Sequence, residues 1–371
     1  MSKATETILE IDLQALRHNY RYLTSRLNKE TKVMAVVKAS GYGSEPLAVA
    51  KELAGLGVDY FAVAYVSEGI ALRDEGIETP ILVLHPQIDN FEAIISRCLE
   101  PALYSRRILT AFIESAERLG QNNYPVHLKF NSGLNRLGVV ETDLNWIVDR
   151  LNETTSIRVK SLFSHLVASE DASERTFSLQ QIQRFKSFAD DFQRSLSYMP
   201  LLHQSNTSGI INFPEAHFDM VRTGIGLYGY ANHPDEDRQL KPVALLKSVI
   251  SQIHTIQPNE TVGYNRAYTA KATEKSATIP IGHADGIPRS LGNGTGHVLI
   301  NGEKAPIIGN VCMDMLMVNV SEIECEEGDE VIIIGEDIPA TVLSEAANTI
   351  SYELLTGVSQ RIRRVIKNAS E

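Results

Sequence analysis

The sequence predicts an α/β fold, an N-terminal (β/α)8 barrel of the TIM type followed by a second, mostly β domain. The first observation is a repeated alternation of short apolar runs and helical stretches from about residue 30 to residue 230. The second is a change after about residue 240 to short β-branched runs separated by Gly, Pro and Asn. The third is the length of 371 residues, which is enough for two domains with sizeable cores.

Eight apolar runs are candidate buried strands of the first domain. They read VMAVVK (33–38), YFAVAY (60–65), PILVLH (80–85), PALY (101–104), VHLKFN (126–131), VKSLFSH (159–165), LLHQS (201–205) and FDMVR (218–222). Helical stretches such as SEPLAVAKELAGLG lie between most of them, which predicts parallel strands with crossover helices. Eight such units over about 200 residues match a closed barrel. An open doubly wound sheet is the alternative, although no GxGxxG motif follows the first run.

The second domain is predicted from runs such as LKSVISQIHTI, GHVLING and DEVIIIG, which are typical of antiparallel strands. We place the boundary in the polar stretch HPDEDRQLK, so that the barrel covers residues 1–238 and the β domain 239–371. The run ILEIDLQ near the start alternates like a strand, and residues 1–12 could pair with the second domain.

Composition excludes several classes of function. A formal net charge of −11 gives no general attraction to nucleic acid or anionic membranes, so we expect neither as a partner. The N-terminus lacks the apolar core of a signal peptide, and no stretch approaches the roughly 20 apolar residues of a spanning helix. Cys98, Cys312 and Cys325 are odd in number and far apart. They argue against disulfides and a zinc site, and we expect a cytoplasmic protein without a metal.

Polar residues collect where the predicted strands end. They are Lys38 at the end of the first run, Asn131 at the end of the fifth with Arg136 in the loop that follows, His165 at the end of the sixth, Ser205 at the end of the seventh and Arg222 at the end of the eighth. The carboxyl ends of barrel strands form the active-site mouth, so these residues converge on one candidate site for a small molecule.

Lys38 is the most specific of these residues. Burial lowers the pKa of a lysine and makes its amine nucleophilic toward an aldehyde. The alternative is a lysine whose ammonium extends from the barrel rim into water. The following SGYG favours the site, because two glycines permit a tight turn and Tyr42 between them could flank a planar cofactor.

The stretch RTGIGLYG (222–229) is a candidate phosphate-binding turn. Glycines just after a strand leave backbone N–H groups free to hold phosphate, and TIM-type barrels often bind phosphate after their seventh and eighth strands. An ordinary glycine-rich turn is the alternative.

Motifs in both domains, in the same order from about Ile8 to the C-terminus, resemble alanine racemase, a fold-type III pyridoxal-phosphate enzyme. They read AVVKASGYG, LKFNSGLNRLGV, FSHL, HQSNTSG, DMVRTGIGLYG, VGYNRAYTA, IGHADGIPR and GNVCMDM. The resemblance implies the same two-domain architecture. It also implies an isomerase that interconverts L-alanine and D-alanine and so supplies D-alanine for peptidoglycan.

The resemblance assigns roles to individual residues. Lys38 would carry pyridoxal 5'-phosphate covalently and act as one of two catalytic bases, with Tyr264 as the other. The remaining cofactor-binding residues would be Tyr42, Ser205, Gly224, Ile225 and Tyr352 at the phosphate, Arg222 at the pyridine nitrogen, and His165 hydrogen-bonded behind it. Arg136 and the backbone N–H of Met313 would bind the substrate. Lys129 matches a lysine that is carbamylated in many relatives, where it orients that arginine.

Two opposed bases suffice for racemisation, since the α-proton leaves one face and returns to the other. A cation such as Arg136 could lower the pKa of Tyr264, and Arg222 stays protonated, so the pyridine nitrogen should remain neutral. In the family the tyrosine enters the site of the partner subunit. The resemblance therefore implies a homodimer with shared active sites.

The chain departs from the family at several positions. Most relatives carry Asn-Ala-Tyr-Gly-His where residues 40–44 read SGYGS, and many carry Asp at Asn131, near Lys129, the candidate for carbamylation. His283 replaces a common tyrosine and Asn310 a common arginine near the substrate entrance, which leaves the strictness of alanine specificity open.

Three other functions remain as alternatives. The first is racemisation of another amino acid or a broader range, such as serine or lysine. The second is a fold-type III decarboxylase, which pairs the pyridine nitrogen with a carboxylate where this chain has Arg222. The third is a non-catalytic pyridoxal-phosphate-binding protein, which would lack the second domain that carries Tyr264.

Overall fold

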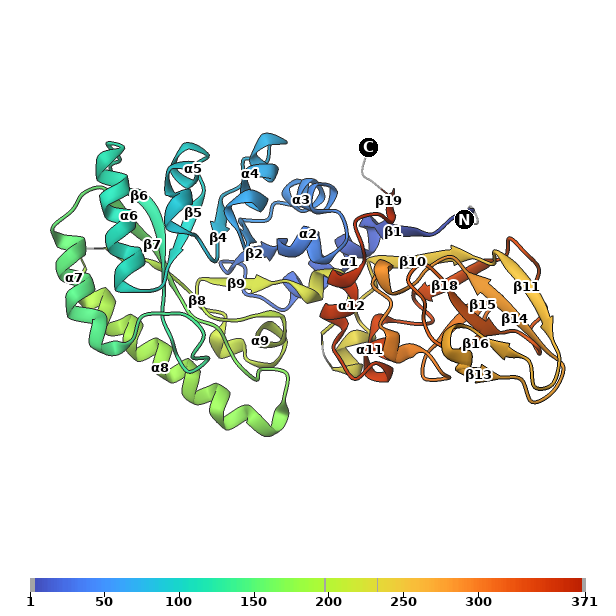
Figure 1. Cartoon of the computed structure of the whole chain (residues 1–371). Helices are drawn as coiled ribbons and strands as arrows, with labels where there is room; N and C mark the ends of the chain where they lie inside the picture. The colour runs from blue at the N-terminus through green and yellow to red at the C-terminus, as the bar shows by residue number, and fades with distance from the viewer. Residues whose placement is uncertain (1–3, 197, 232, 369–371) are drawn as a thin grey trace. The chain divides into compact units, whose positions relative to one another are not determined.

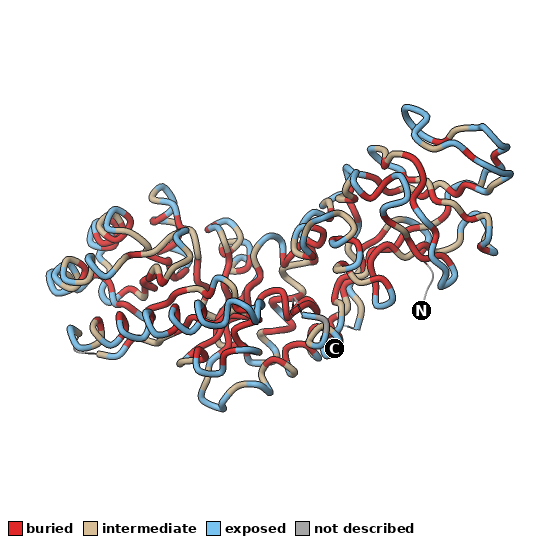
Figure 2. The backbone as a smooth tube through the Cα atoms, turned by 90° about the horizontal axis from the view of Figure 1, so that it is seen from below, coloured by how far each residue is buried: buried red, intermediate tan, exposed pale blue. Residues whose placement is uncertain are grey.

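The computed structural model describes residues 4–196, 198–231 and 233–368. The chain forms two compact units. One, the barrel unit, comprises Arg17–Gly41 and Pro46–Leu240; the other, the β unit, comprises the N-terminus up to Leu16, Tyr42–Glu45 and everything from Lys241 on. Figure 2 shows buried backbone inside each unit and exposed backbone on the outer turns. Among the described residues, no helix has the length and apolar character needed to cross a membrane.

The barrel unit contains the closed eight-stranded barrel that the sequence predicts, which excludes the open sheet (Figure 1). Its strands are β2 (Lys32–Val36), β3 (Tyr60–Val63), β4 (Ile81–Val83), β5 (Glu100–Leu103), β6 (Tyr124–Lys129), β7 (Ile157–Phe163), β8 (Leu201–His203) and β9 (Met220–Thr223). All neighbours run parallel, and β2 closes the barrel by pairing Lys32 with Met220 of β9. Each strand begins within or beside one of the eight apolar runs.

Helices cover the barrel, and the longer ones bury an apolar stripe against it. The α-helices in this part of the chain are α1 (Leu13–Ser25), α3 (Pro46–Gly55), α4 (Val66–Asp74), α5 (Phe91–Ser96), α6 (Arg106–Arg118), α7 (Leu144–Asn152), α8 (Arg175–Arg194), α9 (Thr207–Asn212) and α10 (Pro234–Asp237). The element α2 (Lys38–Tyr42) is a left-handed turn. In α6, the Ser105 side chain accepts a hydrogen bond from the Ile108 backbone, and Phe112 and Ala116 are buried one and two turns later.

The β unit is built on a nine-stranded sheet in the order β11-β14-β17-β16-β15-β18-β10-β1-β19. The strands are β1 (Ile8–Asp12), β10 (Ala244–Val249), β11 (Gln252–Ile256), β14 (Glu274–Ile279), β15 (His297–Ile300), β16 (Glu303–Ile308), β17 (Leu316–Asn319), β18 (Glu330–Ile334) and β19 (Arg363–Lys367), with a separate pair β12 (Thr261–Val262) and β13 (Tyr268–Thr269), and helices α11 (Ala340–Ala346) and α12 (Ser351–Gly357). β1 pairs antiparallel with β10 and parallel with β19.

A buried ion-pair cluster joins these last strands. Glu10 of β1 is 3% exposed, and its carboxylate lies 3.1 Å from the Lys247 ammonium and 2.8 Å from that of Lys367. The two lysines hold the pKa of Glu10 below its usual value although burial opposes them. A buried carboxylate is tolerated here because opposite charges and hydrogen bonds compensate its lost hydration.

The chain turns in the left-handed sense directly after Lys38. Residues 39–43 all have positive φ, with values of 52° at Ala39, 55° at Ser40 and 54° at Tyr42. Three of the five are not glycine, so the turn holds L-residues in a disfavoured conformation. At Gly43 a Cβ atom would lie 1.9 Å from the Leu355 carbonyl oxygen, which leaves no space for any other residue.

Candidate active site

Lys38 lies two residues beyond the end of β2 and is partly buried. Burial and the nearby Arg136 guanidinium lower the pKa of its ammonium, while Glu68 opposes them. Glu68 opens α4, where its carboxylate accepts hydrogen bonds from the backbone of Ala39 at 2.6 Å and of Tyr65 at 3.0 Å. The amine therefore has a raised neutral fraction, on a turn that a neighbouring helix holds in place.

Arg222 is the most constrained side chain of the barrel mouth. It is 5% exposed, and its two terminal nitrogens donate to His203 Nδ1 at 2.7 Å, the His203 carbonyl at 3.3 Å, the Ser164 carbonyl at 2.6 Å, His165 Nδ1 at 3.1 Å and the Gln204 carbonyl at 3.1 Å. Burial lowers the pKa of Arg222 to about 9, so the guanidinium stays charged at neutral pH. Burial and Arg222 keep the pKa of His165 well below its usual value, so that imidazole is neutral.

Lys129 ends β6 and is buried at 8% exposure. Burial and the charges of Arg136, Arg222 and Lys38 lower the pKa of Lys129 to about 8. The Phe163 ring lies 5.9 Å from the Lys129 ammonium and 5.4 Å from the Arg222 guanidinium, with its face toward both cations. The mouth thus holds several cations close enough to shift one another's pKa, and its electrostatic potential favours an anionic ligand.

The predicted phosphate region follows β8 and β9. Ser205 is fully buried, its hydroxyl donates to the Ala216 carbonyl at 2.8 Å, and its own carbonyl accepts from the Arg222 backbone at 3.0 Å. Gly224 precedes a short 3-10 helix, η5 (Ile225–Tyr228). The backbone N–H of the next glycine along, Gly226, donates to the Thr207 hydroxyl at 3.2 Å, which ties this turn to the start of α9. The structure therefore places Ser205 beside Arg222 and the glycine turn beside α9.

Asn131 shapes the loop that carries Arg136. Its side-chain oxygen accepts from the backbone of Gly133 at 3.2 Å and of Asn135 at 3.0 Å, and its amide donates to the Asn135 side chain at 2.9 Å. The Asn131 amide is therefore used within its own loop.

Two predicted site residues of the second domain, Tyr264 and Met313, line an open cleft of about 690 Å³ in the β unit. Tyr264, in the 3-10 turn η6 (Tyr264–Arg266), is 74% exposed, and Met313 is 60% exposed. Both line the cleft together with Met315 and Met317. The Asn310 side-chain amide donates to the Tyr264 carbonyl at 3.0 Å and so fixes the backbone of the predicted base. The cleft presents large apolar side chains to solvent.

The turn that carries Met313 is held by the backbone of the 3-10 turn η7 (His283–Asp285). The His283 N–H donates to the Cys312 carbonyl at 2.9 Å, and the Ala284 N–H donates to the Met313 carbonyl at 3.0 Å. A Cβ on Gly282 would lie 2.4 Å from both carbonyl oxygens, so only glycine permits this approach. His283 therefore supports Met313 through its main chain.

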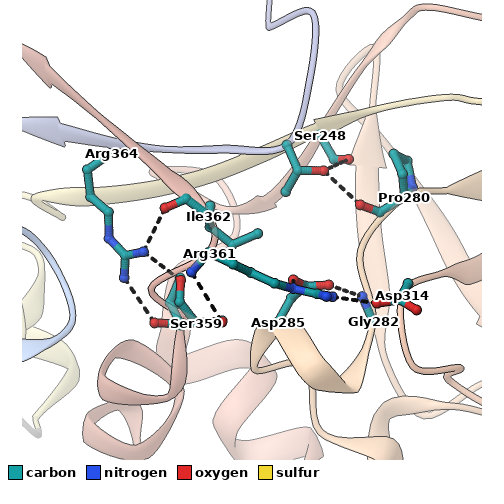
Figure 3. A network of polar contacts seen from close by, with 11 residues as sticks. Ser248, Pro280, Gly282, Asp285, Asp314, Ser359, Arg361, Ile362 and Arg364 are labelled. Carbon is teal, nitrogen blue, oxygen red and sulfur yellow. Dashed lines mark hydrogen bonds and ion pairs between the residues drawn. The ribbon is translucent and has the colours of Figure 1, made fainter.

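Charged side chains also fix this turn (Figure 3). The buried Asp285 carboxylate accepts from the Gly282 N–H at 2.9 Å and from Arg361 at 2.6 Å. The same guanidinium reaches Asp314, next to Met313, at 2.7 Å. These contacts hold the backbone around Met313 while its side chain stays exposed.

Tyr42 and Tyr352, both predicted to hold phosphate, lie together in the β unit. Their ring centroids are 6.0 Å apart, and burial raises the pKa of Tyr42 so that its hydroxyl stays protonated. The barrel unit holds Lys38, Lys129, Arg136, His165, Ser205, Arg222, Gly224 and Ile225, and the β unit holds Tyr42, Tyr264, Met313 and Tyr352.

Sequence reasoning missed two contributors. Glu68 lies in a stretch with a helical pattern and no motif. Only its place in the first turn of α4 could have indicated that its carboxylate accepts backbone hydrogen bonds there. His203 lies in the seventh apolar run and reads as core, although a histidine inside a buried strand signals a required polar partner.

Both halves of the sequence match family descriptions. Residues 11–232 match the alanine racemase N-terminal domain, and residues 243–366 match the alanine racemase C-terminal domain. Alanine racemase of Halothermothrix orenii is 36% identical over 370 residues, covering 98% of this chain and 97% of the relative. That of Carboxydothermus hydrogenoformans is 36% identical over 365 residues, covering 96% and 98%.

Solved structures agree. Alanine racemase of Clostridium difficile 630 is similar with a TM-score of 0.91 at 34% identity, covering 99% of this chain and 97% of that one. The Bartonella henselae alanine racemase with covalently bound pyridoxal phosphate has a TM-score of 0.89 at 29% identity, covering 98% and 100%. The barrel mouth, the β domain and these full-length matches lead to one conclusion: the chain belongs to the alanine racemase family.

Proposed function

We propose that this chain interconverts L-alanine and D-alanine with pyridoxal 5'-phosphate attached to Lys38. The observation that carries the proposal is the cationic barrel mouth around a lysine whose pKa is lowered by burial and by Arg136. Such a mouth suits both an anionic cofactor and the carboxylate of an amino acid. When bound, the cofactor supplies a conjugated electron sink that acidifies the α-proton of the amino acid joined to it.

The residues of the barrel mouth fit this cofactor. The terminal nitrogens of Arg222 are engaged by the protein, and no residue of the described chain accepts from its Nε–H. That donor is available to a ring nitrogen, which Arg222 would leave unprotonated because a guanidinium gives up no proton at neutral pH. Ser205 and the backbone of Gly224 and Ile225 would hold the phosphate, joined by the hydroxyls of Tyr42 and Tyr352.

Two bases would then move the proton. Lys38 takes it from or returns it to one face of the α-carbon, and Tyr264 serves the other face. Arg136 would help to place the substrate, and the backbone N–H of Met313, held by the turn around His283, would bind its carboxylate.

We also propose that Tyr264 acts in the site of a second copy of the chain. Tyr264, Met313 and Met315 are 74%, 60% and 47% exposed, although all three are large apolar side chains that line one cleft. Exposed apolar groups gathered in this way are typical of a surface that another chain covers. The active unit would be a homodimer with two shared sites.

Lys129 is a candidate for carbamylation. A pKa of about 8 leaves an appreciable neutral fraction near pH 7, and the neutral amine is the form that reacts with carbon dioxide. The product would be an anion amid the charges of Arg136 and Arg222, which stabilise it.

Asn310 motivates one alternative, racemisation of a broader range of amino acids. Its amide fixes the Tyr264 carbonyl at the place where many relatives have an arginine, so the surroundings of Tyr264 differ in charge. Comparing kcat/KM for L-alanine, L-serine and L-lysine decides between them, and alanine ranking well behind another substrate would favour the alternative.

The central test uses the purified protein. We expect an absorption band near ~420 nm from lysine-bound cofactor. Borohydride should abolish the band and leave a label on Lys38, and Lys38→Ala should lack the band while remaining folded. A colourless wild type that takes up no added cofactor contradicts the proposal.

A second measurement tests the two bases. Tyr264→Phe should keep the absorption band and lose most racemase activity, since the cofactor site is intact but one face has no base. Unchanged racemisation in both directions would remove Tyr264 from the mechanism. Lys38→Ala serves as the matched variant that removes the opposite base together with the band.

A further inference from the structure

A continuous chain of buried polar side chains crosses the interior of the barrel. It links Glu100 to His127, Ser161, His203 and Arg222, and we call it the barrel relay. Glu100 Oε2 lies 2.6 Å from His127 Nε2, His127 Nδ1 lies 2.5 Å from Ser161 Oγ, Ser161 Oγ lies 2.8 Å from His203 Nε2, and His203 Nδ1 lies 2.7 Å from the Arg222 guanidinium.

We propose that the barrel relay positions Arg222 for its ligand, with Glu100 as the fixed end. The role at the ring nitrogen rests on the proposed function, whereas the proton arrangement of the relay does not. Neither Glu100 nor His127 reaches the barrel mouth by a contact of its own. They would act on Arg222 only through His203, as positioning residues rather than catalytic ones.

The members of the relay are buried, so each of their polar groups needs a hydrogen-bond partner. His127, Ser161 and His203 are each 0% exposed, Arg222 is 5% and Glu100 is 9% exposed. They come from five successive barrel strands, β5 to β9, and the interior of such a barrel is ordinarily filled by Val, Ile and Leu. Since a buried polar group without a partner is costly, each link is retained only if every donor meets an acceptor.

The chemistry of the two ends sets one direction for all hydrogen bonds. A guanidinium only donates, so His203 Nδ1 must accept from Arg222. Burial and the Arg222 charge keep the pKa of His203 well below its usual value, so the ring is neutral with its proton on Nε2, which donates to Ser161. The Ser161 hydroxyl then donates to His127 Nδ1, and His127 Nε2–H donates to Glu100.

Every member is satisfied in this direction and in no other. If the order were reversed, His203 would carry its proton on Nδ1 and oppose the N–H of Arg222 at 2.7 Å. The Glu100 end holds the direction, because a carboxylate only accepts. Tyr60 adds a second hydrogen bond to Glu100, and burial together with Glu100 raises the pKa of Tyr60, so it stays a donor.

The relay fixes the orientation of the Arg222 guanidinium. Because His203 Nδ1 remains an acceptor, it engages one terminal nitrogen, while the carbonyls of Ser164 and Gln204 engage the other. The Nε–H is then the donor left for a ligand. Loss of an acceptor anywhere in the relay leaves a buried N–H unpaired and releases His203 from this arrangement.

Two kinds of measurement test the relay on the cofactor-loaded protein. In ¹⁵N-histidine-labelled wild type, NMR should show His203 as a neutral ring protonated on Nε2, and His127 with a proton on the Nε2 that faces Glu100. Each of Glu100→Leu and Ser161→Ala leaves a buried N–H of the relay without its acceptor and so lets Arg222 turn away from His203 Nδ1, and both should then give mixed or exchanging tautomers at His203. They should also lower kcat about tenfold with KM for alanine within about twofold, since Arg222 serves the cofactor rather than the substrate.

Two further variants keep the test sharp. Glu100→Gln retains an acceptor and should lose clearly less kcat than Glu100→Leu. Ser178 in α8 carries another buried hydroxyl, which donates to the Ala168 carbonyl at 3.4 Å. Ser178→Ala should change neither the His203 tautomer nor kcat. If Glu100→Leu does not fold, Ser161→Ala decides the matter alone.

The proposal is overturned if wild-type His203 carries its proton on Nδ1, or if Ser161→Ala keeps both the wild-type tautomer and the wild-type kcat. Failure of the proposed function looks different. The wild type would then lack the absorption band and racemase activity, while the tautomers of His203 and His127 would still be as described.

Discussion

The barrel mouth and the cleft of the β unit hold complementary halves of the same set of predicted residues, yet they are built in opposite ways. Arg222 in the mouth is 5% exposed and makes five hydrogen bonds, whereas Tyr264 in the cleft is 74% exposed. The mouth is cationic, whereas the lining of the cleft includes Met313, Met315 and Met317 and no cationic side chain among the described residues. The barrel thus holds its charged side chains in place before any ligand binds. The β unit instead holds the backbone around Tyr264 and Met313 in place and leaves their side chains exposed.

This contrast separates two ways of preparing a site. In the mouth, orientation comes from side-chain hydrogen bonds in a dry interior, where they are strong and costly to lose. In the cleft, orientation comes from main-chain contacts such as those between η7 and the Met313 turn. Substitutions in the mouth should therefore affect folding and function together, and substitutions of exposed cleft side chains should affect function alone.

The largest expected effect on the free energy of unfolding comes from removing the Arg222 guanidinium from the mouth. Arg222→Gln leaves His203 Nδ1 and the carbonyls of Ser164 and Gln204 without their donor. We expect the free energy of unfolding to fall by about 3–5 kcal/mol, because buried acceptors lose their partner. Urea unfolding of both proteins measures this. A loss below about 1 kcal/mol would show that the mouth does not depend on this hydrogen-bonded cation.

A smaller effect of opposite sign, a gain in the free energy of unfolding, is expected when the Lys129 charge in the mouth is removed. The folded-state pKa of Lys129 is about 8, below the 10.5 of a free lysine, so the unfolded chain binds the proton more tightly and stability rises with pH between these values. Lys129→Met should be more stable than wild type at pH 7 by about 2–3 kcal/mol in carbon dioxide-free buffer. The advantage should shrink toward pH 10. Thermal unfolding across this range checks it, and an advantage that is constant with pH would contradict the shift.

The smallest expected effect lies in the cleft. Met313→Ala should change the free energy of unfolding by less than about 0.5 kcal/mol, because the side chain is exposed. KM for alanine should also stay within about twofold, since the backbone N–H rather than the side chain is proposed to bind the carboxylate. Urea unfolding and steady-state kinetics measure both. A large rise in KM would assign the substrate contact to the methionine side chain.

Much of the mouth could be predicted because its residues stand at the ends of apolar runs. Lys38, His165 and Ser205 lie two residues beyond the ends of β2, β7 and β8, Arg222 lies near the end of β9, and barrel geometry places strand ends together. The relay could not be predicted, because His127 and His203 lie inside apolar runs and Glu100 precedes one. Their partners come from other strands, and periodicity carries no information about which interior side chains meet.

The residues of the cleft are harder to predict from the sequence, for a different reason. Tyr264 and Met313 lie in short irregular turns, where only the family motifs distinguished them from ordinary exposed residues. The placement of Tyr42–Glu45 in the β unit depends on contacts with distant residues, such as the bonds from Arg364 to the carbonyls of Gly43 and Ser44. No local pattern indicates them.

The left-handed turn after Lys38 restricts which sequences this enzyme can explore. Each non-glycine residue there carries a conformational penalty of about 1–2 kcal/mol, and Gly43 meets the Leu355 carbonyl. In a library randomised over residues 39–43, survivors should keep glycine at 43 and be depleted of Val, Ile and Thr at 39 and 40. Asparagine at 40 should be enriched, since its side chain tolerates this conformation best. The segment beside the reactive amine is thus one of the least evolvable in the chain, for reasons of backbone sterics rather than chemistry.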